Sequence, residues 1–145
     1  MKVRFAALLG LVFACAGCNG SALTTTVPTT TAGTGTETFA SFLAIGGWSI
    51  HTFPVTQAGT IAITLTAVTP ATVVGLGVGV PNSTGSGCAL TNSLEASAAI
   101  ADATTGATTP QLTIAAAVGT YCAEVYDSGQ LGGIGRTFSV TIAHP

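Results

Sequence analysis

From residue 37 onward, short segments rich in Val, Ile, Thr and Phe alternate with clusters of Gly, Pro and Asn. The clusters recur at intervals of about ten residues, a spacing typical of all-β sandwiches. Within residues 59–65, Ile61, Ile63 and Leu65 alternate with small or polar residues. A period of two indicates a strand with one buried face. The sequence therefore predicts a single all-β domain, an antiparallel β-sandwich.

Residues 74–80 show the same alternation in an unusual form. The apolar residues are separated by Gly75, Gly77 and Gly79, so one whole face of this segment carries no side chain. Glycine by itself weakens a strand. A bare face therefore predicts either close approach of another backbone or a surface covered by other groups.

Turns are predicted at Pro81-Asn82, at residues 127–129 and at Gly46-Gly47. The glycine pair separates the apolar segments 39–45 and 48–55 and predicts a tight hairpin turn. Residues 94–102 are ambiguous, because their alanines favour a helix whereas their alternation also fits a strand. The neighbouring strands favour the strand.

The N-terminus is typical of an export signal. Lys2 and Arg4 precede an apolar run over residues 5–16. A membrane-spanning helix needs about 20 apolar residues, so this run is too short to span a bilayer. The basic start and the small residues at its end indicate a secretory signal.

The end of this signal resembles a bacterial lipobox, in which Cys18 becomes the acylated N-terminus. The match rests on Ala16, Gly17 and Cys18, because Cys15 stands where the lipobox usually has Leu. The predicted organisation is a signal peptide at 1–17, a flexible Thr-rich tether at 18–36 and the domain at 37–145. In some bacteria an Asp directly after the acylated cysteine favours retention in the inner membrane. This chain has Asn19 at that position, so we expect the outer membrane or the cell surface.

Charge excludes two classes of partner. Only 6% of the residues are charged, and beyond the signal Arg136 is the sole basic residue. Nucleic-acid binding needs several phosphate-neutralising cations, so no nucleic-acid partner is expected. A polybasic membrane patch is excluded for the same reason, and the membrane is expected as a partner only through the lipid.

Cleavage and acylation would leave Cys88 and Cys122 as the remaining thiols. Two cysteines in an exported domain favour one disulfide bond between them. The alternative is a pair of buried, unpaired cysteines.

Three segments resemble the bacterial pre-peptidase C-terminal domain: Gln57-Ala58-Gly59-Thr60 with the alternation that follows it, residues 119–127 and residues 138–142. The likeness covers residues 37–145. It implies a jelly-roll β-sandwich and an exported setting. It implies no catalytic residue, because no peptidase domain precedes this segment. Related modules bind calcium through clustered acids, but the acids here are scattered, so calcium is not expected.

No catalytic or metal site is predicted. His51 and His144 are the only candidates for a neutral-pH base. We expect His51 to be a strand residue near the edge of the core and His144 to lie in a frayed tail. A Ser-His-Asp site using His51 and Asp127 lacks the G-x-S-x-G elbow. Zinc needs three or four ligands, which these residues do not offer, and no cofactor is expected.

The strand around Trp48 carries the predicted binding residues. If Phe53 and Val55 point inward, period two places Trp48 and Ile50 outward. An exposed aromatic beside an aliphatic marks a contact surface for a peptide, polysaccharide or protein. The alternative is that a loop covers them or a bulge turns them inward.

Together these features predict a lipid-anchored, non-enzymatic module of the bacterial cell envelope that binds or spaces something. One alternative is a structural surface protein that self-associates through nearly uncharged strands, because low charge protects strand edges poorly. A more remote alternative is a hydrolase without a recognisable motif. The sequence specifies neither a ligand nor an oligomeric state.

Overall fold

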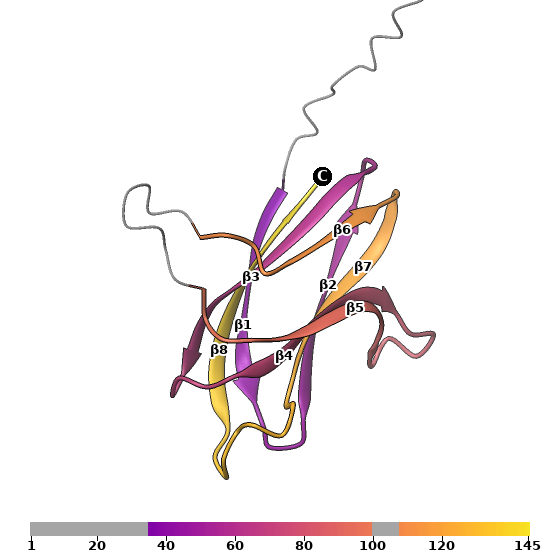
Figure 1. Ribbon diagram of the computed structural model, residues 1–145. Helices are drawn as coiled ribbons and strands as arrows, with labels where there is room; N and C mark the ends of the chain where they lie inside the picture. Colours follow the sequence, from indigo (N-terminus) through magenta and orange to yellow (C-terminus); the bar gives the residue numbers. More distant parts are fainter. Residues whose placement is uncertain (1–34, 100–107) are drawn as a thin grey trace, which may run out of the picture.

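The computed structural model describes residues 35–99 and 108–145, and these residues form strands and turns without a helix (Figure 1). Cys18, the signal and nearly all of the tether lie outside the described residues. The strands are β1 (Gly35–Leu43), β2 (Trp48–Val55), β3 (Gly59–Thr69), β4 (Val74–Pro81), β5 (Cys88–Ala96), β6 (Leu112–Ala116), β7 (Gly119–Tyr126) and β8 (Arg136–His144).

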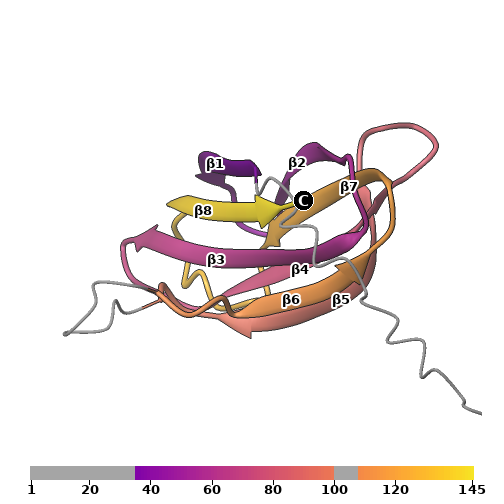
Figure 2. The ribbon, with the colours of Figure 1, turned by 90° about the horizontal axis from the view of Figure 1, so that it is seen from above.

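The strands form two antiparallel sheets that pack face to face (Figure 2). Sheet A has the strand order β1-β8-β3-β6, and sheet B has the order β2-β7-β4-β5. Every connection except β4–β5 passes from one sheet to the other. This arrangement is an eight-stranded jelly roll. The predicted antiparallel, jelly-roll-like β-sandwich is confirmed.

The core lies between the sheets and uses the predicted alternation. Ile61, Ile63 and Leu65 on β3 are fully buried, as are Val74, Leu76 and Val78 on β4. β3 is longer than residues 59–65, because a register shift after Leu65 lets it continue along β8 to Thr69. The sandwich thus buries one face of each central strand.

The turn at Gly46-Gly47 forms, but the predicted hairpin is wrong. Gly46 has a φ of 64°, and the Gly47 N–H donates to the Ala44 carbonyl over 3.0 Å. β1 nevertheless pairs with β8, and β2 pairs with β7. A turn signal specifies chain reversal and not the pairing partner, and here both partners come from the far end of the chain.

Both ends of the domain are more ordered than the sequence indicates. β1 begins at Gly35 and not at Glu37, because Gly35 and Thr36 pair with the end of β8. The same pairing makes His144 a buried strand residue, so the frayed tail predicted there is wrong. The strand expected over 94–102 ends at Ala96, and residues 100–102 lie outside the described residues.

The predicted disulfide bond between Cys88 and Cys122 is present, with a Cα–Cα distance of 5.9 Å. The two cysteines belong to β5 and β7, which flank β4 on opposite sides. Cys122 lies opposite Gly79 of β4. The bond therefore joins the two neighbours of β4 next to Gly79, where β4 has no side chain.

The bare face of β4 is covered, as its glycines predict. A Cβ at Gly75 would lie 2.2 Å from the Tyr126 ring, and one at Gly77 would lie 2.7 Å from the Leu90 side chain. At Gly79 the obstacle is backbone, because a Cβ would lie 2.0 Å from the Ala89 carbonyl oxygen. All three glycines are buried under groups from the two neighbouring strands.

Alanine substitutions should separate the two kinds of contact. Gly79→Ala forces backbone apart, and we expect it to lower the free energy of unfolding by about 1–3 kcal/mol. Gly77→Ala meets only the mobile end of Leu90, and alanine recovers about 0.5–1 kcal/mol of strand stability, so the net change should be near zero. Urea denaturation of both variants measures the difference. Equal losses would show that the approach of β5 at Gly79 is not restrictive.

Candidate functional site

The outer surface of sheet B, called the Trp48 face below, carries two aromatic and two acidic side chains, Trp48, Tyr126, Glu95 and Glu124. Strand register arranges it in three rows across β2, β7, β4 and β5. The rows are Trp48, Tyr126, Gly75 and Glu95; Ile50, Glu124, Gly77 and Ser93; and Thr52, Cys122, Gly79 and Leu90.

Trp48 is the most prominent group of this face. Its side chain is 61% exposed, whereas Phe53, on the opposite face of the same strand, is 1% exposed. Ile50 lies on the same side as Trp48 and is half-buried. No bulge interrupts the β2–β7 pairing. The structure therefore places both residues on the outer side, and the alternative of an inward-turned Trp48 does not hold.

Asp127 holds the backbone next to Trp48. Its Oδ2 accepts a hydrogen bond from the Gly46 N–H at 2.8 Å, and its own N–H donates to the Gly47 carbonyl at 2.9 Å. Its Oδ1 accepts from the Gly129 N–H at 2.7 Å. These N–H donors, that of Gly46 first, hold the pKa of the Asp127 carboxyl below its usual value. From the sequence Asp127 is only a turn residue; this cross-link is visible only in the structure.

The middle of the Trp48 face is covered by groups from the strands on either side of β4. Tyr126 lies over Gly75 and Leu90 lies over Gly77, so the groups that cover β4 occupy the space that side chains would otherwise fill. No pocket is found in the part of the chain that the structure describes. A surface without a pocket suits an extended ligand better than a small one, since small-molecule sites are concave.

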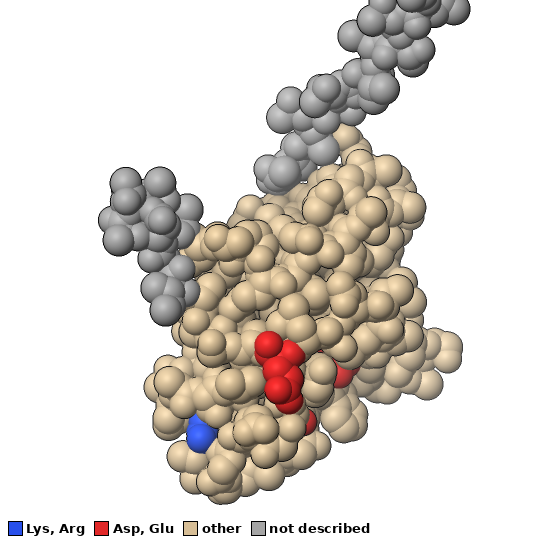
Figure 3. Space-filling view, in the orientation of Figure 1, with Lys and Arg blue, Asp and Glu red and all other residues tan. Residues whose placement is uncertain are grey.

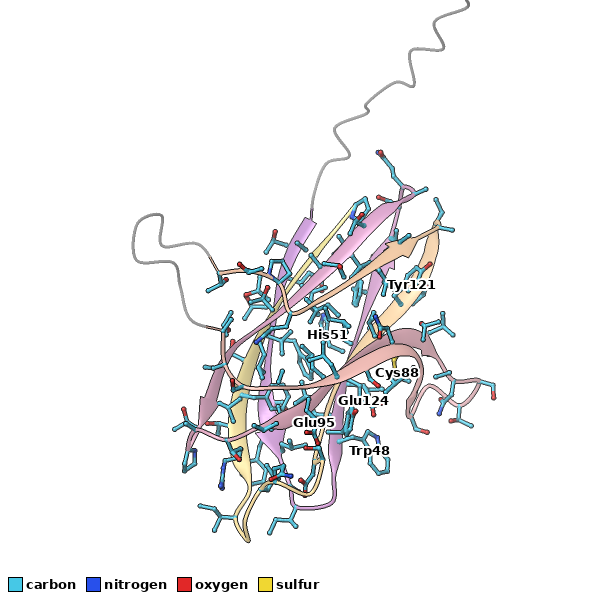
Figure 4. All side chains as sticks on the ribbon, in the orientation of Figure 1. Trp48, His51, Cys88, Glu95, Tyr121 and Glu124 are labelled. Atoms are coloured by element: carbon cyan, nitrogen blue, oxygen red, sulfur yellow. A yellow bond between two sulfur atoms is a disulfide. The ribbon has the colours of Figure 1, made fainter. Side chains whose placement is uncertain are left out.

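Two carboxylates give this face its polarity. Figure 3 shows acidic groups gathered in one part of an otherwise nearly uncharged surface, and Figure 4 labels Trp48, Glu95 and Glu124 in that region. Glu95 is exposed and Glu124 is half-buried. Burial raises the pKa of Glu124, partly offset by a backbone hydrogen bond from Cys88.

The one basic side chain among the described residues does not contribute to this face. Arg136 is buried, with 8% of its surface exposed. Its Nη1 donates to the carbonyls of Ile134 at 2.7 Å and Gly135 at 3.2 Å. The guanidinium therefore bonds to the last two residues of the loop before β8, and among the described residues the Trp48 face carries acidic groups without a cation.

A second cluster of titratable groups joins the two sheets. The Glu37 carboxylate lies between two imidazoles: His51 Nε2 is 2.6 Å from its Oε2, and His144 Nε2 is 3.1 Å from its Oε1. The rings also pack on phenylalanines, His51 on Phe39 at 5.3 Å and His144 on Phe53 at 5.1 Å between centroids. The alternation of residues along the strand places His51 near the edge of the core, as observed. It does not reveal that one carboxylate bridges both histidines.

This geometry argues against the hydrolytic arrangement considered from the sequence. His51 is hydrogen-bonded to Glu37, whereas Asp127 binds backbone N–H groups of the turns. The pairing of His51 with Asp127 is therefore wrong. Within residues 35–99 and 108–145, no three His, Cys, Asp or Glu side chains are grouped so as to hold a metal ion. No helix of those residues has the length and apolar character needed to cross a membrane.

Comparison of the chain with models of known protein families finds no match, and comparison with curated proteins finds no similar sequence. The resemblance to pre-peptidase C-terminal domains thus rests on its residues and remains a prediction.

The Glu37 cluster should make stability depend on pH. The hydrogen bond from His51, first among several effects, lowers the pKa of Glu37 despite an opposing effect of burial. A carboxyl whose pKa is lowered by folding stabilises the native state above its unfolded pKa, and this contribution is lost as the pH falls through its folded pKa. Glu37→Gln should therefore lower the melting temperature at pH 7, and the difference should shrink below about pH 4.

Glu95→Gln is the matched control, because Glu95 is an exposed glutamate on the outer surface of the other sheet. Thermal unfolding followed by circular dichroism between about pH 3 and pH 7 gives both curves, a range that spans carboxyl titration. A destabilisation by Glu37→Gln that stays constant over this range would contradict a role for the Glu37 charge.

Proposed function

We propose that the protein is an exported, lipid-anchored module of the bacterial cell envelope that has no enzymatic activity and binds its partner through the Trp48 face. The observation that carries the proposal is the 61% exposure of Trp48 on a sheet surface that it shares with Ile50, Tyr126 and two glutamates. Tryptophan is enriched at binding hot spots because it offers a large, rigid contact area.

The few charged residues of the fold also support this assignment. Glu37 and Asp127 bond to other strands and turns of the sandwich, and Arg136 bonds to the two residues before it. The remaining described charges, Glu95 and Glu124, both lie on the Trp48 face. Two of the three described glutamates thus lie on the face that carries the exposed tryptophan.

The orientation of the domain suits an anchored binder. The described chain starts at Gly35, and the nine residues of β1 lead to the turn before Trp48. At about 3.3 Å per residue, β1 separates the tether attachment from this turn by about 30 Å. Figure 1 shows the two at opposite ends of the sandwich. A lipid on Cys18 would leave Trp48 at the end remote from the membrane, and the jelly roll also fits the resemblance to pre-peptidase C-terminal domains.

Self-association is the second candidate function, and one apolar cluster favours it. Phe42, Ile45 and Ile134 are 60%, 58% and 57% exposed. Phe42 lies against Gly135, where a Cβ would be 2.2 Å from its ring. Sedimentation of the unlipidated protein over a concentration series tests this alternative, because a simple binding module stays monomeric.

The anchor is tested first. Metabolic labelling with a fatty-acid analogue should mark the wild type and spare Cys18→Ser, because acylation needs the Cys18 thiol. The labelled protein should sediment with membranes, since two or three acyl chains anchor stably where one does not. Labelling of both forms, or a soluble wild type, would refute the anchor.

Binding is tested with the soluble Cys18→Ser protein and isolated cell envelopes. Trp48→Ala should weaken binding by about 1–3 kcal/mol and leave stability nearly unchanged. Val118→Ala is the matched control, because Val118 is 67% exposed on the turn between β6 and β7. Acrylamide should quench the single tryptophan of the free protein, and bound envelopes should protect it. Equal binding by Trp48→Ala and wild type would refute the site.

A further inference from the structure

We infer that the ligand of the Trp48 face is an uncharged polysaccharide. This inference rests on the proposed function and names the chemical class of its ligand. It follows from four features of the face: an exposed indole, carboxylates without a described cation, the lack of a pocket among the described residues, and the width of the face across four strands.

The indole and the carboxylates match the two sides of a sugar ring. A pyranose has faces made of C–H groups and a rim of hydroxyl groups. The exposed face of Trp48 offers an apolar surface for the C–H groups. Glu95 and Glu124 lie across the same sheet, and carboxylate oxygens accept hydrogen bonds from hydroxyl groups.

The charges of the Trp48 face restrict the ligand to uncharged polymers. The face has two acidic residues, and the described cation, Arg136, is buried in its own loop. Phosphorylated or uronic-acid polymers would be repelled by these carboxylates. The half-burial of Glu124 disfavours its charged form, which suits hydrogen bonding to neutral hydroxyls better than pairing with a cation.

The shape of the face indicates a polymer. The described residues form no pocket that would enclose a monosaccharide. From β2 to β5 the face crosses three strand spacings, about 14 Å in all. A chain of several sugar rings laid across the strands would contact the Trp48 side and the Glu95 side together.

The row through Trp48 and Tyr126 provides the start of this path. Tyr126 covers Gly75 and lies between Trp48 and Glu95 in the register. A ligand crossing the strands along this row would therefore contact Trp48 and then Tyr126.

The first experiment uses envelopes treated in two ways. The Cys18→Ser protein is mixed with envelopes oxidised by periodate, which cleaves vicinal diols of sugars, or digested with protease. We expect periodate to abolish binding and protease to leave it intact. Binding lost with protease and kept after periodate would identify a protein ligand, which overturns the inference and leaves the proposed function standing.

The second experiment uses defined polymers, with affinity electrophoresis in gels containing neutral glucans, xylan, mannan or acidic polygalacturonate. We expect retardation by a neutral polymer and none by polygalacturonate. Trp48→Ala should raise the Kd about 5- to 150-fold. Tyr126→Ala and Glu124→Gln should also raise it, whereas Val118→Ala should not.

The dependence of binding on salt concentration distinguishes an uncharged glycan from a basic ligand. Binding of an uncharged glycan should be unchanged between about 0.05 and 0.5 M NaCl, because screening affects only charged partners. Binding lost at high salt would indicate a basic ligand and overturn the inference. Absence of binding to untreated envelopes and to every polymer would overturn the proposed function itself.

Discussion

The bare face of β4 is the constraint on which sheet B depends. Because positions 75, 77 and 79 have no Cβ, groups from β7 and β5 lie directly on this strand. Tyr126 and Leu90 cover two of the glycines, and the β5 backbone at Ala89 covers the third. The same absence of side chains lets the Cys88–Cys122 bond join the strands on either side of β4. The covering of β4 by its neighbours and the disulfide bond between those neighbours thus have one cause.

The domain has few charged residues, and most of them make a distinct structural contact. Glu37 bridges a histidine of each sheet, Asp127 joins the two turns beside Trp48, and Arg136 bonds to the last two residues of the loop before β8. Glu37 and Asp127 thus bond to segments that are distant from them in the sequence. Glu124 accepts a backbone hydrogen bond from Cys88, and both Glu124 and Glu95 lie on the outer surface of sheet B, where we propose that the ligand binds.

The site around Trp48 depends on both a local sequence pattern and the tertiary structure. Alternation along β2 is enough to place its side chain opposite that of Phe53. Alternation does not say which residues lie beside it, because those come from β7, and β7 is distant in the sequence. The pairing with Tyr126 and the hydrogen bonds of Asp127 to Gly46 and Gly47 are long-range contacts. They make the exposed tryptophan part of an ordered surface.

The amino-acid sequence by itself determined the all-β class, the inward residues of β3 and β4, the covered glycine face and the Cys88–Cys122 pair. These follow from local periodicity, the lack of a Cβ and the small number of cysteines. Only the tertiary structure decided that β1 and β2 lie in different sheets, that His144 is buried beside Glu37, and that two glutamates share a face with Trp48. The physical reason is that strand partners are chosen by the packing of whole sheets, and no local pattern of residues specifies a partner a hundred positions away.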